Sequence, residues 1–106
     1  MIYHSTRNAA LQADSAQAVL NGLAPDGGLY VPQSLPVIDV KEALQEDTFC
    51  QAKRIIGAML PDIPDMDMLV EKAYSGKFTT RELTPTVQAG PFTVLELFHG
   101  PTSAFK

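Results

Sequence analysis

The sequence predicts an α/β chain that is locally α+β: a small helical domain with short strands, followed by one apolar strand. Three observations support this class. Apolar residues recur at three- and four-residue spacing over residues 49–60, which is the helical period. Prolines and glycines divide much of the rest into short extended pieces. Residues 92–98 (FTVLELF) are apolar on both faces, which is typical of a strand covered on both sides within an α/β sheet.

The first 36 residues predict one short helix between extended segments. Residues 1–8 are expected to be extended and to end in a turn. Asp14 or Ser15 can cap a helix that Gly22 closes as a left-handed residue. The residues expected on its core-facing side are Ala16, Val19 and Leu20. Residues 24–28 (APDGG) predict a tight turn with positive φ, residues 29–32 a short strand, and residues 32–36 an extended crossing fixed by prolines.

Three further helices are predicted before residue 77. Asp39 can cap a short helix over residues 40–45, and Asp47 or Thr48 can cap a longer one that runs to Leu60. The last of the three starts near residues 64–65 and ends at Gly76. It is expected to bury Met66, Leu69, Val70, Ala73 and Tyr74. After it, residues 83–87 are expected to be extended and residues 89–91 to turn the chain into the strand 92–98.

The composition excludes several classes of function. The formal net charge is −4 and the pI is about 4.9, so a nucleic-acid partner, which requires a basic face, is not expected. The apolar runs are too short to span a bilayer, and no membrane association is expected. The N-terminus has no signal-peptide pattern, and the single cysteine, Cys50, cannot form an internal disulfide. The cytoplasm is therefore the expected compartment.

The residues best suited to chemistry lie at the end of the chain. Gly100 and Pro101 break the strand, Thr102 or Ser103 can cap a new helix, and Lys106 would follow in its first turn. A strand, a turn and a helix start form the place where open α/β sheets bind ligands. A lysine amine there suits covalent chemistry with an aldehyde. On spacing alone, a surface lysine is the favoured explanation of the pattern.

Other polar residues have simpler explanations beside the functional ones. His99 could serve as a general base or brace a turn through hydrogen bonds. Arg7 could approach an anionic ligand or support the neighbouring turn. The glycines at 27 and 28 lack the following helix of a phosphate loop and favour a turn. No metal site is expected, because His4 and His99 do not make a ligand cluster and the acidic residues gather at helix starts.

Four segments together resemble the threonine synthases, which are pyridoxal-phosphate enzymes of the tryptophan-synthase-β type. They are residues 5–7 (STR), residues 16–32 (AQAVLNGLAPDGGLYVP), residues 73–78, and residues 96–106 (ELFHGPTSAFK), of which the last is the most specific. The sequence departs from the family pattern at Asn8, where members usually have glycine, and at Ser103. Asparagine tolerates a left-handed backbone, so the turn at Asn8 is expected to survive.

The resemblance implies a set of functional expectations. Lys106 would hold pyridoxal 5'-phosphate in a Schiff base, Phe105 could lie beside the cofactor, and Thr102 and Ser103 could bind substrate. The activity implied is that of a lyase in threonine biosynthesis, which converts O-phospho-L-homoserine and water to L-threonine and phosphate. Residues 1–90 would form the family's N-terminal domain. Residues 91–106 would supply the first strand and helix start of the cofactor-binding α/β domain.

The same resemblance predicts that this chain is an N-terminal segment without activity of its own, because the phosphate-binding residues of the family come later. Two alternatives stay open. The segment could be a stand-alone packing or interaction module, or it could belong to a threonine-synthase-like phospholyase that acts on other phosphorylated amino alcohols. The apolar strand 92–98, if left uncovered, is also expected to make the chain self-associate.

Overall fold

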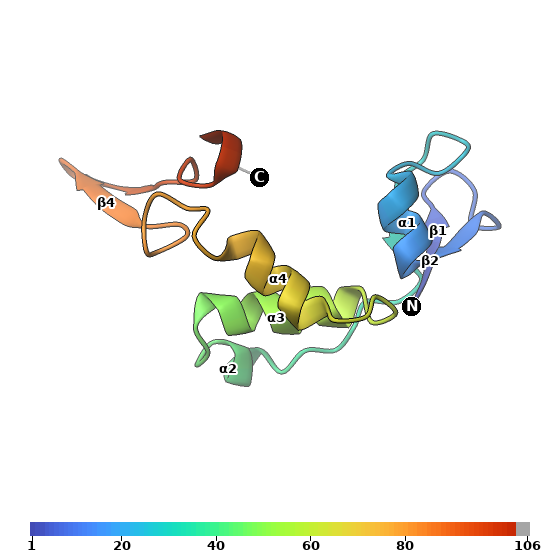
Figure 1. Ribbon diagram of the computed structural model, residues 1–106. Coiled ribbons are helices and arrows are strands. Elements are labelled where there is room, and N and C mark those ends of the chain that lie inside the picture. The colour runs from blue at the N-terminus through green and yellow to red at the C-terminus, as the bar shows by residue number, and fades with distance from the viewer. Residues whose placement is uncertain (104–106) are drawn as a thin grey trace. The chain divides into compact units, whose positions relative to one another are not determined.

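A computed structural model describes residues 1–103 as a mixture of α-helices and short β-strands (Figure 1), which confirms the predicted class. Its internal contacts divide the chain into an N-terminal unit, Met1–Val70, and a C-terminal unit that begins at Glu71. The assignment of residues 1–90 and 91–106 to two domains of a larger enzyme stays a prediction. Within residues 1–103, no helix combines the length and apolar character that crossing a membrane requires.

A three-stranded antiparallel sheet organises the N-terminal unit. The strands are β1 (Ile2–Ser5), β2 (Gln12–Asp14) and β3 (Tyr30–Pro32), in the order β2-β1-β3. Tyr3 in the central strand lies opposite Ala13 on one side and Pro32 on the other. The extended segments containing β1 and β3 were predicted, whereas β2, which has only three residues and no apolar alternation, was not. The chain turns between β1 and β2, where the Ser5 N–H donates to the Leu11 carbonyl over 3.0 Å.

Helix α1 (Ser15–Asn21) lies beside β1 and β2 and is capped as predicted, but its buried side differs. The Asp14 carboxylate accepts from the Gln17 N–H over 2.8 Å, and Gly22 has φ +70°. Of the expected core-facing residues, Val19 and Leu20 are exposed, and Leu20 retains 85% of its accessible surface. Ser15 and Ala18 are buried instead. Their small side chains let the helix approach the sheet closely, so that Ala18 packs with Tyr3 and Ala13.

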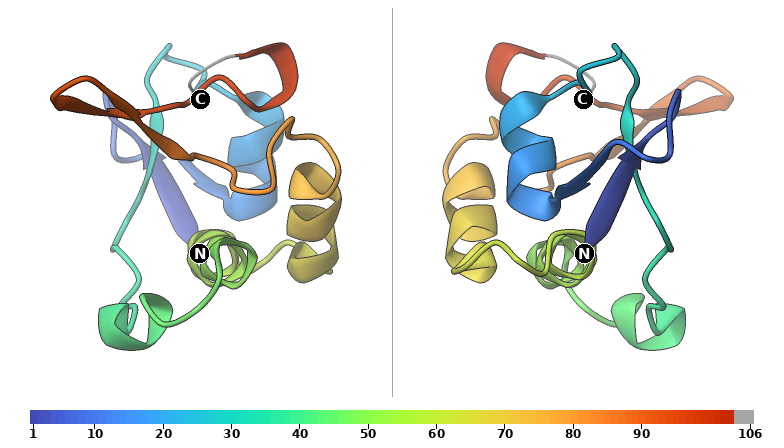
Figure 2. Two further views of the ribbon diagram at one scale, coloured as in Figure 1. Left: turned by 90° about the vertical axis from the view of Figure 1, so that its left-hand side faces the viewer. Right: turned by 90° about the vertical axis from the view of Figure 1, so that its right-hand side faces the viewer.

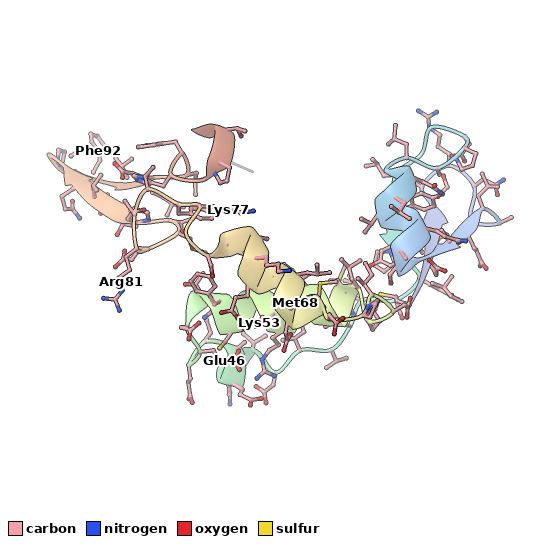
Figure 3. All side chains as sticks on the ribbon, viewed as in Figure 1. Glu46, Lys53, Met68, Lys77, Arg81 and Phe92 are labelled. Atoms are coloured by element: carbon pink, nitrogen blue, oxygen red, sulfur yellow. The ribbon has the colours of Figure 1, made fainter. Side chains whose placement is uncertain are left out.

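Helices α2 (Val40–Ala43) and α3 (Thr48–Met59) follow the prediction closely. The carboxylates of Asp39 and Asp47 cap them by accepting from backbone N–H groups three residues on. An ion pair joins the two, because Arg54 of α3 donates Nε–H to Glu46 over 3.0 Å and its Nη2 lies 3.2 Å from Glu42. The Glu46 carboxylate lies just before α3 (Figure 3), and its bond with Arg54 lowers its pKa.

Long-range polar contacts connect the sheet to the end of α3 and to the loop after it. The Tyr3 hydroxyl donates to the Met59 carbonyl. Asp62, just beyond, accepts from the N-terminal amine of Met1 over 2.6 Å and from the fully buried Ser15 hydroxyl over 2.9 Å. These bonds lower the pKa of the Asp62 carboxyl, with the amine contributing most. The first and sixty-second residues are therefore held together by charge and hydrogen bonding.

Helix α4 (Met66–Tyr74) starts and ends where the sequence predicts, and Gly76 has φ +67°. Its burial is less than expected. Val70 alone of the five expected residues is buried, whereas Leu69 and Ala73 are exposed and Met66 and Tyr74 are half-buried. The spacing of the five residues places them on one side of the helix, but the rest of the described chain covers only part of that side.

The last two strands of the described chain, β4 (Thr86–Ala89) and β5 (Phe92–Leu95), form a hairpin joined at Gly90 with φ +62° (Figure 2). Strand β5 is shorter than the predicted 92–98, and the cover expected on both of its faces does not come from the described residues. The strand ends at Leu95 and pairs only with β4, and every residue of the hairpin is exposed. Two strands cannot cover their own faces. One face carries the apolar pairs Val87–Val94 and Ala89–Phe92.

Candidate functional site

The predicted chemical residues lie at or beyond the end of the described chain. Lys106 and Phe105 fall outside the described residues. Pro101, Thr102 and Ser103 form a single 3₁₀ turn, η1 (Pro101–Ser103), in which Thr102 is exposed and has φ +69°. An N-cap residue has an extended backbone, so Thr102 does not cap a helix here. What the structure describes is the approach to the lysine, residues 96–103.

His99 holds this approach in place. Its Nδ1 lies 2.8 Å from the Thr79 hydroxyl and its Nε2 lies 2.6 Å from a Glu96 carboxylate oxygen. Its carbonyl accepts from the Thr79 N–H over 3.0 Å. The predicted bracing role is thus confirmed, with two side chains bound to the ring and the backbone contact made by the carbonyl. Contacts with residues 79 and 96 therefore account for both ring nitrogens in the described chain.

The aromatic ring of Phe78 closes the other side of the same turn. A Cβ placed on Gly100 would lie 3.1 Å from this ring, so the glycine permits a close approach of the backbone. Phe78 stacks in turn on Tyr74 of α4, with ring centroids 5.9 Å apart. The Glu96 N–H donates to the Pro85 carbonyl over 2.9 Å. Residues 78–85 therefore form the support on which residues 96–100 rest.

A second polar cluster lies in the N-terminal unit, where residues 5–7 meet the turn 24–28. The buried Ser5 hydroxyl donates to the Asp26 carboxylate over 2.8 Å, and the Gly28 N–H donates to the same carboxylate over 2.9 Å. These two bonds, that of Gly28 first, hold the pKa of the Asp26 carboxyl below its usual value. Arg7 donates Nη1–H to the Asp26 carbonyl over 2.8 Å.

The donors of this turn are used within the turn. The Gly27 N–H donates to the Ala24 carbonyl over 2.8 Å, and the Gly28 N–H is taken by Asp26. A bound phosphate would need these groups free. The predicted turn and the supporting role of Arg7 are therefore confirmed, and the arrangement does not form a phosphate cradle.

The turn expected at Asn8 is present, but hydrogen bonds of Asn8 hold it rather than a left-handed backbone. The Asn8 side chain accepts from the Ala10 N–H over 3.0 Å and its carbonyl accepts from the Leu11 N–H over 3.0 Å. Asn8 does not adopt the positive φ expected of a residue that replaces a glycine.

Over the described part of the chain, no three His, Cys, Asp or Glu side chains gather as a metal site would require.

Comparisons with known proteins decide the family. A family model described as "Threonine synthase N terminus" matches residues 2–74. The chain belongs to the threonine synthase family. Threonine synthase of Saccharomyces cerevisiae is 36% identical over 121 residues, an alignment that covers 99% of this chain and 23% of the yeast protein. Threonine synthase-like 2 of Pongo abelii is 35% identical over 114 residues, with 100% of this chain and 23% of that protein covered.

A solved structure agrees with this family assignment. The pyridoxal-phosphate-bound threonine synthase from Brucella melitensis superposes with a TM-score of 0.81 and 35% identity, covering 99% of this chain and 24% of that one. The chain thus spans about a quarter of the length of the relatives it matches. Both the resemblance read from the sequence and the mixed fold are confirmed.

Replacing Gly28 by alanine is expected to destabilise the N-terminal unit by about 1–3 kcal/mol, as overpacking typically does. The new Cβ would lie 2.1 Å from the Ser5 hydroxyl oxygen, which is itself held by Asp26. Gly57→Ala is the matched control, because a Cβ at Gly57 in α3 meets nothing within 4 Å. That change should stabilise the helix by about 0.5–1 kcal/mol. Thermal melts followed by circular dichroism measure both, and equal effects would contradict the crowding at Gly28.

The Asp26 carboxylate is expected to make stability depend on pH. A carboxyl with a lowered pKa in the folded chain stabilises the fold above its unfolded pKa, and this contribution is lost as pH falls below about 4. The difference in unfolding free energy between the wild-type chain and Asp26→Asn should therefore narrow between about pH 5 and pH 2. The difference between the two unfolding free energies isolates the contribution of Asp26, because the other carboxylates are common to both chains. Ser5→Ala, which removes one of the two donors, should give an intermediate slope, measured by denaturant titration.

Proposed function

We propose that this chain is the N-terminal segment of a threonine synthase that converts O-phospho-L-homoserine and water to L-threonine and phosphate in the cytoplasm. The observation that carries the proposal is the alignment of essentially the whole chain with a pyridoxal-phosphate-bound member of the family at a TM-score of 0.81. The reaction belongs to the complete enzyme. The chain by itself is expected to be inactive, because it spans about a quarter of the relatives' length.

The proposed cofactor is pyridoxal 5'-phosphate, which when bound supplies an electron sink for bond cleavage next to the amino acid's α-carbon. In this proposal Lys106 is its attachment point, Phe105 lies beside it, and Thr102 and Ser103 bind substrate. The turn 24–28 does not suit the phosphate group, because its N–H donors are occupied. The phosphate group and most substrate contacts are therefore assigned to the part of the enzyme that follows residue 106.

Lys106→Ala in the complete enzyme is expected to lower threonine formation at least about a hundredfold, because the variant loses both the attachment point and a proton-transferring amine. Lys77→Ala is the control, since Lys77 is an exposed lysine of the same unit (Figure 3). Threonine and phosphate released from O-phospho-L-homoserine measure the activity. Undiminished turnover by Lys106→Ala, or turnover by residues 1–106 alone, would contradict the proposal.

The second candidate reaction is that of a threonine-synthase-like phospholyase. Its support is the 35% identity to a relative named threonine synthase-like 2, which is close to the identity with the yeast threonine synthase. The two candidates differ in product and substrate. Release of phosphate from another phosphorylated amino alcohol, without threonine from O-phospho-L-homoserine, would select the phospholyase.

A packing or interaction role for the chain itself is supported by its exposed apolar face. The N-terminal unit has its own buried cluster, whereas the hairpin exposes Phe92 to 69% and leaves Val87 and Val94 beside it exposed. Phe92, the first residue of β5, is labelled in Figure 3. We infer that an isolated chain self-associates through this face.

Sedimentation of the isolated chain is expected to show an average mass that rises with concentration. Phe92→Ser should weaken the association about tenfold or more, because it removes most of a large buried apolar contact. Thr93→Ser is the matched control, because Thr93 lies on the opposite face of β5 and serine keeps the hydroxyl that binds Gln88. A mass that stays at one chain over the whole concentration range would contradict this role.

A further inference from the structure

The hairpin and the turn after it invert the usual rule of burial. Residues 91–98 are all exposed except Glu96, which is half-buried. His99, the next residue, is half-buried as well. The side chains of His99 and Glu96 retain 13% and 21% of their accessible surface, whereas Phe98 between them retains 54% of its residue surface. Polar groups are seldom withdrawn from water ahead of apolar neighbours unless they have specific partners.

The partners determine the state and orientation of the His99 ring. A carboxylate can only accept, so the nitrogen 2.6 Å from Glu96, Nε2, carries a proton. Nδ1 then accepts from the Thr79 hydroxyl at 2.8 Å when the ring is neutral. Glu96 and Thr79 hold the ring from two sides, and its plane cannot rotate without breaking both contacts.

The backbone on either side of the ring is held by the same support. The Thr79 N–H donates to the His99 carbonyl, and a Cβ on Gly100 would crowd the Phe78 ring at 3.1 Å. Thr102, two residues on, has a left-handed backbone with φ +69°. His99 and Gly100 thus hold the chain against residues 78 and 79 just before the turn Pro101–Ser103.

We propose that His99 is a positioning residue: it fixes the entry of the chain into the turn Pro101–Ser103, after which the sequence continues to Lys106. This inference rests on the proposed function, in which the Lys106 amine must meet an aldehyde carbon. A reacting group displaced by about 1 Å can lose about a hundredfold in rate. The ring itself touches neither substrate nor cofactor in this assignment.

The first test uses the chain of 106 residues. Amide exchange at Thr79, followed by nuclear magnetic resonance, is expected to accelerate at least tenfold in His99→Ala. It should be largely restored in His99→Asn, whose amide keeps a donor and an acceptor. His4→Gln is the control, because it replaces the only other histidine, in β1. Nitrogen-15 spectra should show the Nε2–H tautomer for His99. Unchanged exchange in His99→Ala, or the opposite tautomer, would overturn the proposal.

The second test uses the complete enzyme. His99→Ala is expected to lower kcat about a hundredfold with KM within about twofold, and His99→Asn to recover at least tenfold of the loss. Thr79→Val removes only one partner of the ring and should lower kcat less, in the same direction, even if His99→Ala misfolds. A wild-type enzyme that makes no threonine would refute the proposed function. The bracing contacts of His99 would then still be tested by the amide exchange at Thr79. A competent wild type whose His99→Ala variant keeps its kcat would refute the positioning role.

Discussion

The fold of the N-terminal unit depends on the hydrogen bonds between the buried Ser5 hydroxyl and the Asp26 carboxylate. This contact joins the end of the central strand to the turn that introduces β3, and so sets the register of the two strands. Gly28 is required beside it, because any larger residue would occupy the position of the serine oxygen. With β1 held in this register, Tyr3 can pack in the buried cluster and still reach the Met59 carbonyl at the end of α3.

The parts of the fold that were predictable from sequence are those set by local chemistry. The caps at Asp14, Asp39 and Asp47 involve partners three residues away, and the turns at Gly27 and Gly90 need only a positive φ. Burial was less predictable, because a helical stripe shows which residues share a side but not how much of that side a neighbour covers. In α1 the small residues took the core position, and in α4 most of the stripe stayed uncovered.

The candidate site divides in the same way. The chemistry of His99 suggested a general base or a residue that braces a turn, but nothing in the sequence pairs His99 with Thr79, which precedes it by 20 residues. Contacts over still greater separations, such as those of Asp62 with Met1 and Ser15, were likewise beyond any local pattern. Chemical types can be read from sequence, whereas their partners depend on how distant segments meet.

The position of the sheet in the chain has a consequence for biosynthesis. All three strands lie within the first 32 residues, and the contacts that hold the turn between α1 and β3 come from the same stretch. Translation delivers this stretch before α3, and segments of low sequence separation close quickly once they are free of the ribosome. The nascent polypeptide can therefore assemble its sheet while the ribosome is still adding α3, and the emerging helix then meets a platform on which the Tyr3 hydroxyl is already presented.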